Sequence, residues 1–235
     1  MSVLNFAIIV LIVVSIIIVL NIVFKNKNKL LDFNNGNVEM IFPSNKIDSS
    51  TSTNYTYSLW FYVEDWNYKY GKEKVLLIRS DLNNKSCPKI SLGSFQNDLT
   101  VSVQTYPDTT TTPSVDSQTF NCTVKNVPIQ SWVNTLVSIN GRTLDVYLDG
   151  KLVKTCVMPG VAKVAGSAPV KITPYGGFSG YTSKIEFWAH ATNPQQAWNI
   201  YRKGHGSSNV FNKYKIKLAV IENNKERASY QTGMN

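Results

Sequence analysis

The chain has 235 residues and a formal net charge of +9. The length allows one β-rich domain behind an N-terminal apolar segment and leaves little room for a second. The charge suits anionic lipid or an acidic protein, but no nucleic-acid-binding motif and no basic stripe interleaved with aromatics is present, so nucleic acid is not a predicted partner. Three scattered cysteines exclude a disulfide-rich scaffold, and no Cys-x-x-Cys or paired histidines indicate zinc.

An almost unbroken apolar run extends from Phe6 to Phe24 and is followed by Lys25, Lys27 and Lys29. About 19 helical residues span roughly 28 Å, close to the thickness of the hydrocarbon core of a bilayer. A cleaved signal peptide or a buried helix are the alternatives, but the positive n-region and the small-residue cleavage site of a signal peptide are missing. Residues 1–24 are therefore predicted to be a single transmembrane anchor, with the three lysines at the lipid headgroups.

The lysines also predict orientation, because positive charge next to a span favours the cytosolic side. We therefore expect the body of the protein on the cytosolic face. Three glycosylation sequons, at Asn54, Asn84 and Asn121, argue for the opposite side.

Residues 25–36 read as a basic linker, and alternating apolar residues bounded by turn signals then predict strands. In the segment from Tyr55 to Val63, alternate residues from Tyr57 onward share one apolar face. The predicted strands before residue 130 are 38–43, 55–63, 74–79, 89–92, 99–105 and 120–124.

A three-stranded meander is predicted over 132–139, 142–148 and 151–157. Asn140-Gly141 and Asp149-Gly150 separate these runs, and both dipeptides favour type I′ hairpin turns. Cys122 and Cys156 each fall in a predicted strand. If those strands are neighbours, a disulfide would close about 35 residues and stabilise the fold by roughly 4 kcal/mol, and buried free thiols are the alternative.

Further strands are predicted at 171–173 and 183–190, followed by one short helix. Asn193 is a suitable N-cap, Pro194 occupies the first helical position, Gln196 completes a capping box and Gly204 ends the helix. Its apolar stripe consists of Ala197, Ile200 and Tyr201.

Residues 206–235 form a basic tail with one expected strand. Its apolar positions are Tyr214, Ile216, Leu218 and Val220, which alternate with Lys213, Lys215 and Lys217. Such a strand is expected to pair with a sheet edge, of this chain or of a partner, and to turn its lysines toward anionic lipid or acidic side chains.

Strands of regular length separated by turns favour a two-sheet antiparallel sandwich. Three segments carry a more specific resemblance: Tyr57-Ser-Leu-Trp-Phe-Tyr-Val63, Trp132 through Val153, and Gly177-Phe-Ser-Gly-Tyr with the following Ile185-Glu-Phe-Trp and Pro194 through Gly204. Together they resemble the concanavalin A-like, laminin-G-type jelly roll. The anchor and the segment Thr155 to Gly160 resemble the membrane-anchored versions encoded by giant nucleocytoplasmic large DNA viruses. The resemblance covers 37–205 and implies an all-β jelly-roll sandwich with one short C-terminal helix.

The wider family includes glycosidases, whose retaining mechanism needs two carboxyl groups about 5 Å apart. The corresponding Glu-x-Asp-x-x-Glu spacing is absent, and adjacent Glu64 and Asp65 point to opposite faces of a strand. No Gly-x-Ser-x-Gly elbow is present, and His190 fits a core or rim position. The sequence therefore predicts that the protein is not an enzyme.

Laminin-G-like domains often hold calcium at the rim, for which Asp81, Asp98 and Asp108 are candidates. Their lack of clustered spacing favours solvated surface carboxylates, so no cofactor is predicted. The candidate ligand-contact aromatics are Trp66, Tyr68, Tyr70 and Tyr175. The alternative for Trp66 is that it plugs one end of the sandwich.

The expected function is non-catalytic binding. The resemblance implies a virion membrane or minor capsid protein that links an internal membrane to the capsid, with lipid and capsid proteins as partners. The alternative is a lectin that recognises glycans, and an inactive or unrecognised hydrolase is the third reading.

Overall fold

The computed structural model describes residues 15, 27–47, 52–81, 85–106, 117–206, 216–222 and 225–232. Except for Ser15, the predicted transmembrane segment lies outside these residues, as does Lys25. No helix within the described part of the chain has the length and apolar character needed to cross a bilayer.

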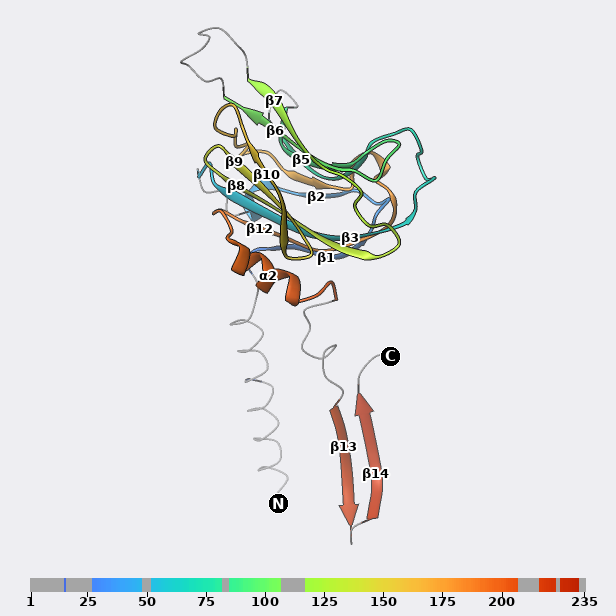
Figure 1. Cartoon of the computed structure of the whole chain (residues 1–235). Helices are drawn as coiled ribbons and strands as arrows, with labels where there is room; N and C mark the ends of the chain where they lie inside the picture. Colours follow the sequence, from blue (N-terminus) through green and yellow to red (C-terminus); the bar gives the residue numbers. More distant parts are fainter. Residues whose placement is uncertain are drawn as a thin grey trace.

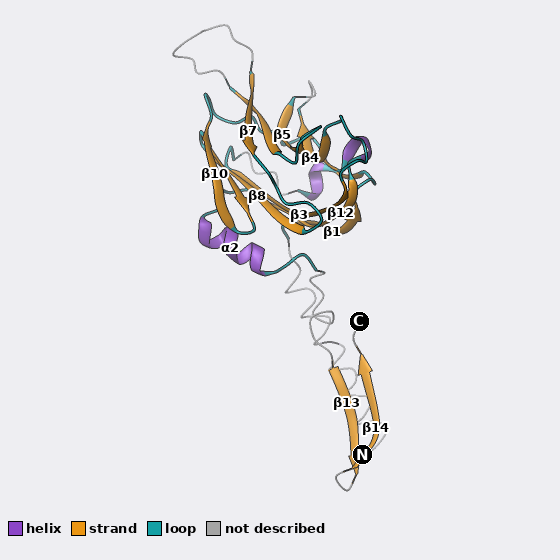
Figure 2. Ribbon diagram, turned by 45° about the vertical axis from the view of Figure 1, so that its right-hand side comes forward, coloured by secondary structure: helices purple, strands orange, loops and turns teal. Residues whose placement is uncertain are grey.

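Two six-stranded antiparallel sheets pack face to face into a sandwich (Figure 1, Figure 2). Sheet A has the order β1 (Lys29–Asn35), β12 (Ser179–Trp188), β3 (Tyr55–Asp65), β8 (Trp132–Asn140), β9 (Thr143–Leu148) and β10 (Lys151–Val157). Sheet B has the order β2 (Met40–Phe42), β11 (Val170–Ile172), β4 (Lys74–Ser80), β5 (Ser86–Leu92), β6 (Leu99–Thr105) and β7 (Gln118–Val124). This confirms the predicted all-β sandwich.

Strand β3 shows how the sequence pattern forms the core. Tyr57, Leu59, Phe61 and Val63 are buried between the sheets, as their alternation predicts. On the opposite face of the same strand, Thr56, Ser58 and Trp60 are buried as well, whereas Tyr62 is half-buried. Trp60 lies against Tyr201 of the C-terminal helix.

The two meander turns differ from each other. Asp149 and Gly150 both have positive φ, 49° and 74°, as the predicted type I′ turn requires. The prediction for Asn140-Gly141 is wrong, because Asn140 pairs with Thr143 and the two turn residues are Gly141 and Arg142. In that turn Gly141 has a φ of 58° at the first central position, which is the place of glycine in a type II′ turn.

Helix α2 (Pro194–Arg202) begins with the predicted capping box, in which the Asn193 side chain accepts from the Gln196 N–H and the Gln196 side chain accepts from the Asn193 N–H. Ala197 and Ile200 pack against Leu136 and Tyr147 on the outer face of sheet A. The helix therefore covers one part of that face (Figure 1).

The predicted linker is partly wrong. Residues Lys29–Asn35 form β1, the edge strand of sheet A, which pairs with β12 through Leu31 and Ile185 and through Phe33 and Ser183. Leu30 and Leu31 pack against the core. The polar composition concealed this strand, because an edge strand needs few inward apolar residues.

In the tail, β13 (Ile216–Glu222) and β14 (Lys225–Thr232) pair with each other as a two-stranded antiparallel sheet. The sequence predicted one strand there and expected it to pair with a sheet edge, whereas the observed ladder partner is a second strand of the tail. Lys217 lies opposite Gln231 in this ladder, and Lys213 and Lys215 lie outside the described residues.

Candidate ligand-binding groove

The outer face of sheet B carries a row of hydroxyl and amide side chains. In β6, Leu99, Val101 and Val103 point into the core, so the intervening residues point away from it. Neighbouring strands bring similar residues beside them: Thr100 lies opposite Ser91 and Thr123, and Ser102 lies opposite Asn121.

These side chains line an open groove of about 460 Å³. Most of its surface is polar in character, and Thr119 and Asn121 on β7 are exposed to solvent at one side. The lining residues are Glu73, Ser86, Lys89, Ser91, Leu92, Gly93, Ser94, Thr100, Ser102, Thr119 and Asn121.

Hydrogen bonds among the polar groups hold the groove in shape. The Lys89 ammonium lies 2.8 and 2.9 Å from the two carboxylate oxygens of Glu73, and the Ser91 hydroxyl donates to Glu73 at 2.6 Å. The hydroxyls of Thr100 and Thr123 lie 3.0 Å apart. A ligand here would meet the neutral side chains of Thr119, Asn121 and the half-buried Thr100 beside one neutralised ion pair.

The described residues that line the groove include one carboxylate, whereas the retaining mechanism of glycoside hydrolysis uses two. This carboxylate is that of Glu73, and Lys89 and Ser91 already engage both of its oxygens. The two-carboxylate mechanism needs an acid and a second carboxylate on opposite sides of the scissile bond. The arrangement can position a polar ligand without supplying that pair.

The four aromatics predicted as ligand contacts do not form one platform. Trp66 packs against the core, which agrees with the alternative that it plugs one end of the sandwich. The ammonium of the buried Lys74 lies 4.3 Å from the centre of the Trp66 ring. Burial lowers the pKa of Lys74, against the attraction of Asp65.

The other three aromatics, Tyr68, Tyr70 and Tyr175, do not share one contact. The Tyr68 hydroxyl donates to the Gly176 carbonyl at 3.1 Å, which places it beside the turn that carries Tyr175. Tyr175 itself is 70% exposed, and Tyr70 instead packs edge-on against Phe95.

The described candidate calcium ligands accept hydrogen bonds from backbone N–H groups of loops. Asp81 accepts from the Lys85 N–H at 2.8 Å, and Asp98 accepts from the Asn126 N–H at 3.1 Å. Asp108 lies outside the described residues. Within the residues that the structure covers, no three acidic, histidine or cysteine side chains come together as a metal site.

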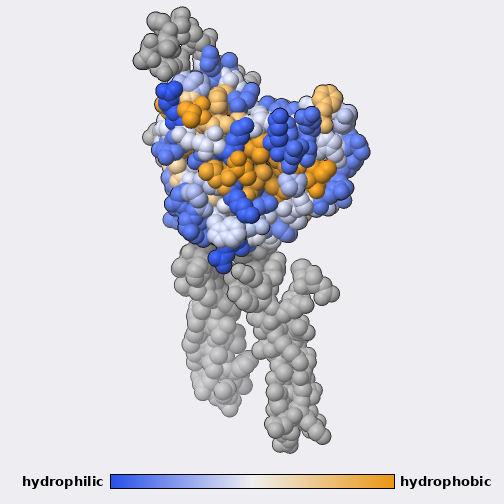
Figure 3. All heavy atoms as spheres, in the orientation of Figure 1, coloured by the Kyte–Doolittle hydropathy of each residue, from blue (hydrophilic) through white to orange (hydrophobic). Residues whose placement is uncertain are grey.

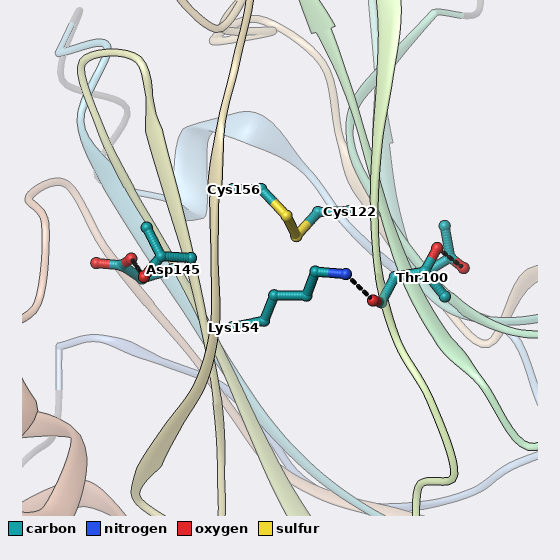
Figure 4. The surroundings of a disulfide bond; sticks show 7 residues. Thr100, Cys122, Asp145, Lys154 and Cys156 are labelled. Carbon is teal, nitrogen blue, oxygen red and sulfur yellow. Dashed lines mark hydrogen bonds between the residues drawn. A yellow bond between two sulfur atoms is a disulfide. The ribbon is translucent and has the colours of Figure 1, made fainter.

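A disulfide joins Cys122 of β7 to Cys156 of β10, with the Cα atoms 6.1 Å apart (Figure 4). These are edge strands of different sheets, so the bridge closes one open side of the sandwich. Lys154 supports it by donating to the Thr123 carbonyl at 2.7 Å. Figure 3 shows an apolar band that crosses the molecule between hydrophilic borders. Among the large apolar residues of β10, Leu152, Val153 and Val157 are exposed.

The family follows from sequence comparison together with this fold. Residues 34–198 match the family model Laminin_G_3, described as the concanavalin A-like lectin/glucanases superfamily. The chain belongs to this superfamily. The match begins inside β1 and ends inside α2, so it covers both sheets of the sandwich. No curated protein matches the chain in sequence.

Among solved structures, the fold is similar to botulinum neurotoxin binding domains. The serotype G binding domain has a TM-score of 0.52 and 12% identity, over 77% of this chain and 47% of that one. The serotype DC binding domain in complex with rat synaptotagmin II has a TM-score of 0.52 and 12% identity, over 75% and 45%. The serotype D ligand-binding domain in complex with N-acetylneuraminic acid has a TM-score of 0.51 and 10% identity, over 75% and 51%. The chain thus spans about half the length of these structures, and the likeness concerns the fold.

The groove residues were not among the site residues predicted from the sequence. Their signal was the strict alternation from Leu99 to Gln104, in which every second residue carries a hydroxyl or an amide. That pattern predicted the strand, but the side chains that face the same way on β5 and β7 become neighbours only through the strand order of sheet B.

Proposed function

We propose that this chain is a non-catalytic binding module held at a membrane by its N-terminal segment, with the groove of sheet B as its ligand site. The observation that carries the proposal is the polar row across β5, β6 and β7, in which Thr119 and Asn121 are exposed and Thr100 is half-buried, while Ser91 and Ser102 are buried. The single neutralised carboxylate supports binding over hydrolysis.

The ligand class that fits best is a glycan. Sugars present many hydroxyl groups that both donate and accept hydrogen bonds, as the groove residues do. The similar fold solved with N-acetylneuraminic acid supports this choice. A protein ligand is the second candidate, supported by the complex of a similar fold with synaptotagmin II.

A glycan array probed with the full chain in detergent tests the site. Loss of one neutral hydrogen bond costs about 1 kcal/mol, so Asn121→Ala is expected to weaken binding roughly fivefold. Asn199→Ala is the matched control, because Asn199 is exposed on α2, outside the groove. Array binding that Asn121→Ala leaves unchanged would move the site elsewhere, and absence of any binding would favour a protein ligand.

The finer setting follows from the resemblance to membrane-anchored jelly rolls of giant DNA viruses. We propose that the anchor places the domain at the internal membrane of a virion, on the cytosolic side that faces the capsid, where it links the two layers. Quantitative detection of the chain in purified virions tests this setting. Its absence from virions, while it is present in host membranes, would contradict the role.

A further inference from the structure

Aromatic side chains gather on the part of the outer face of sheet A that α2 leaves uncovered. Tyr181, Tyr62 and Trp132 lie in one cross-strand row on β12, β3 and β8. Phe33 of β1 stacks on Tyr181 with ring centres 5.5 Å apart and contacts Trp132 at 6.5 Å. Phe33 is 58% exposed, so the group presents an apolar surface to its surroundings. We call these four residues the aromatic face.

The aromatic face continues toward α2. Trp132 stacks on His205 with ring centres 4.4 Å apart and an interplanar angle of 8°. His205 contacts Trp60, which stacks on Tyr201 of the helix. Side chains distant in sequence thus form one layer over this sheet, and a surface of tyrosine, tryptophan and exposed phenylalanine remains at its margin.

The chain enters and leaves the sandwich beside this layer. The Asn28 carbonyl accepts from the Phe187 N–H, and the His205 carbonyl accepts from the Ser183 hydroxyl, so both segments are fixed to β12. Strand β1 and α2 lie on the same side of the sandwich (Figure 1, Figure 2).

The length of the connection limits how far this face can lie from the predicted span. Phe24 ends the apolar run and Phe33 is exposed on the aromatic face. About nine residues separate them, and at ~3.5 Å per extended residue they reach roughly 30 Å at most. Because Lys29–Asn35 is committed to sheet A, the edge of that sheet must stay close to the membrane surface.

The charges around the face suit an anionic surface. Lys27, Arg202 and Lys203 are exposed, and Lys184 of β12 donates to the Lys203 carbonyl at its border. Of the acidic groups nearby, Asp32 pairs with Lys29, Glu186 of β12 is buried, and Glu64 and Asp65 are exposed at the end of β3. Basic groups therefore outnumber acidic ones at this margin.

We propose that the aromatic face lies in the headgroup region of the same bilayer that holds the N-terminal segment. The inference rests on the proposed membrane tether. Tyrosine and tryptophan favour the membrane–water interface, because one part of each ring system is apolar and the other forms hydrogen bonds. Basic residues around them are attracted to anionic headgroups. The domain would then lie on the membrane through sheet A and direct the sheet B groove away from it.

The test places a nitroxide label on the full chain in liposomes of phosphatidylcholine and phosphatidylserine. The labelled variant is Phe33→Cys, and Phe95→Cys is the control, because Phe95 is a 65% exposed phenylalanine in the loop between β5 and β6 of the other sheet. The native cysteines do not interfere, since two are bridged and Cys87 is buried.

Collisions with oxygen, which partitions into lipid, are compared with collisions with an aqueous nickel chelate. The expected ratio of oxygen to nickel collisions is severalfold higher at position 33 than at position 95. Equal, aqueous ratios at both positions would overturn the proposal. Protection of position 33 from both reagents would also overturn it, since the cover would then be protein, either the tail or a second copy.

Resistance to alkaline carbonate extraction reports on the tether separately. A chain that resists extraction but has an aqueous label at position 33 retains its tether and lacks the docked face. A chain that is extracted, yet has a lipid-facing label before extraction, lacks the tether and retains the docked face.

Discussion

At the scale of single residues, the most unusual site is a buried polar group between the sheets. Arg79 is 2% exposed and donates to the carbonyls of Gly166 at 2.7 Å and Ala168 at 3.0 Å. Tyr55, Tyr57 and the free Cys87 line a small cavity with it. The sequence predicted Arg79 at the end of a strand, but its burial could not be predicted, because arginine is usually exposed and its carbonyl partners come from a distant loop.

The titratable residues of this cavity, Cys87, Tyr55 and Tyr57, lead us to expect a loss of stability at alkaline pH. Burial raises the pKa of Cys87 to about 11 and that of Tyr57 to about 12, and it also raises the pKa of Tyr55. The unfolded chain loses these protons at a lower pH than the folded chain does. The free energy of unfolding therefore keeps its full value below about pH 9 and falls as the pH rises toward 12. For Cys87 alone the expected loss is roughly 3 kcal/mol.

Urea unfolding at a series of pH values measures this loss. Cys87→Ala removes the thiol, so its stability should decline less steeply above pH 9 than that of the wild type. The comparison uses the slopes and not the absolute values, because the variant also loses packing at neutral pH. Identical slopes for the two proteins would show that the thiol already titrates normally in the folded state.

At the scale of elements, strands with strict alternation and the helix with its capping box were predictable, since local residues specify them. Strand β1 was not, because its place at the edge of sheet A depends on pairing with β12, far along the chain. The groove and the aromatic face share this property. Each combines ordinary strand residues that only the strand order brings together, so the alternation predicted the strands but not these two surfaces.

The capping box gives a prediction at this scale. Asn193→Ala removes the acceptor of the Gln196 N–H and should lower the free energy of unfolding by roughly 1 kcal/mol. Gln195→Ala is the control, since Gln195 is exposed in the first turn and bonds only a neighbouring side chain, Asn199. Urea unfolding of both variants measures the difference. Equal destabilisation would mean that the cap adds nothing beyond ordinary helix propensity.

The disulfide between β7 and β10 gives a second prediction at the scale of elements. It closes a loop with a sequence separation of 34, so Cys156→Ser should lower the free energy of unfolding by roughly 2–4 kcal/mol. A reducing agent should destabilise the wild type by a similar amount and leave the variant unchanged. If the reductant has no effect on the wild type, the bridge is absent from the protein in solution.

At the scale of the whole molecule, two features disagree about the side of the membrane. The lysines after the apolar run favour a cytosolic domain, whereas a disulfide is more typical of oxidising compartments. The sequons bear on this choice. Asn121 is exposed and lines the groove, so a glycan attached there would occupy the proposed ligand site. A functional groove is therefore easier to reconcile with an unmodified asparagine.

We accordingly expect that the full chain, made in eukaryotic cells, carries no N-linked glycan at Asn54, Asn84 or Asn121. The measurement is gel mobility before and after treatment with an N-glycosidase, with Asn121→Gln as the matched variant. Wild type and variant should migrate alike in both lanes. A shift that disappears in Asn121→Gln would place the domain on the lumenal side, would account for a stable Cys122–Cys156 bridge, and would require the ligand to bind elsewhere than in the groove.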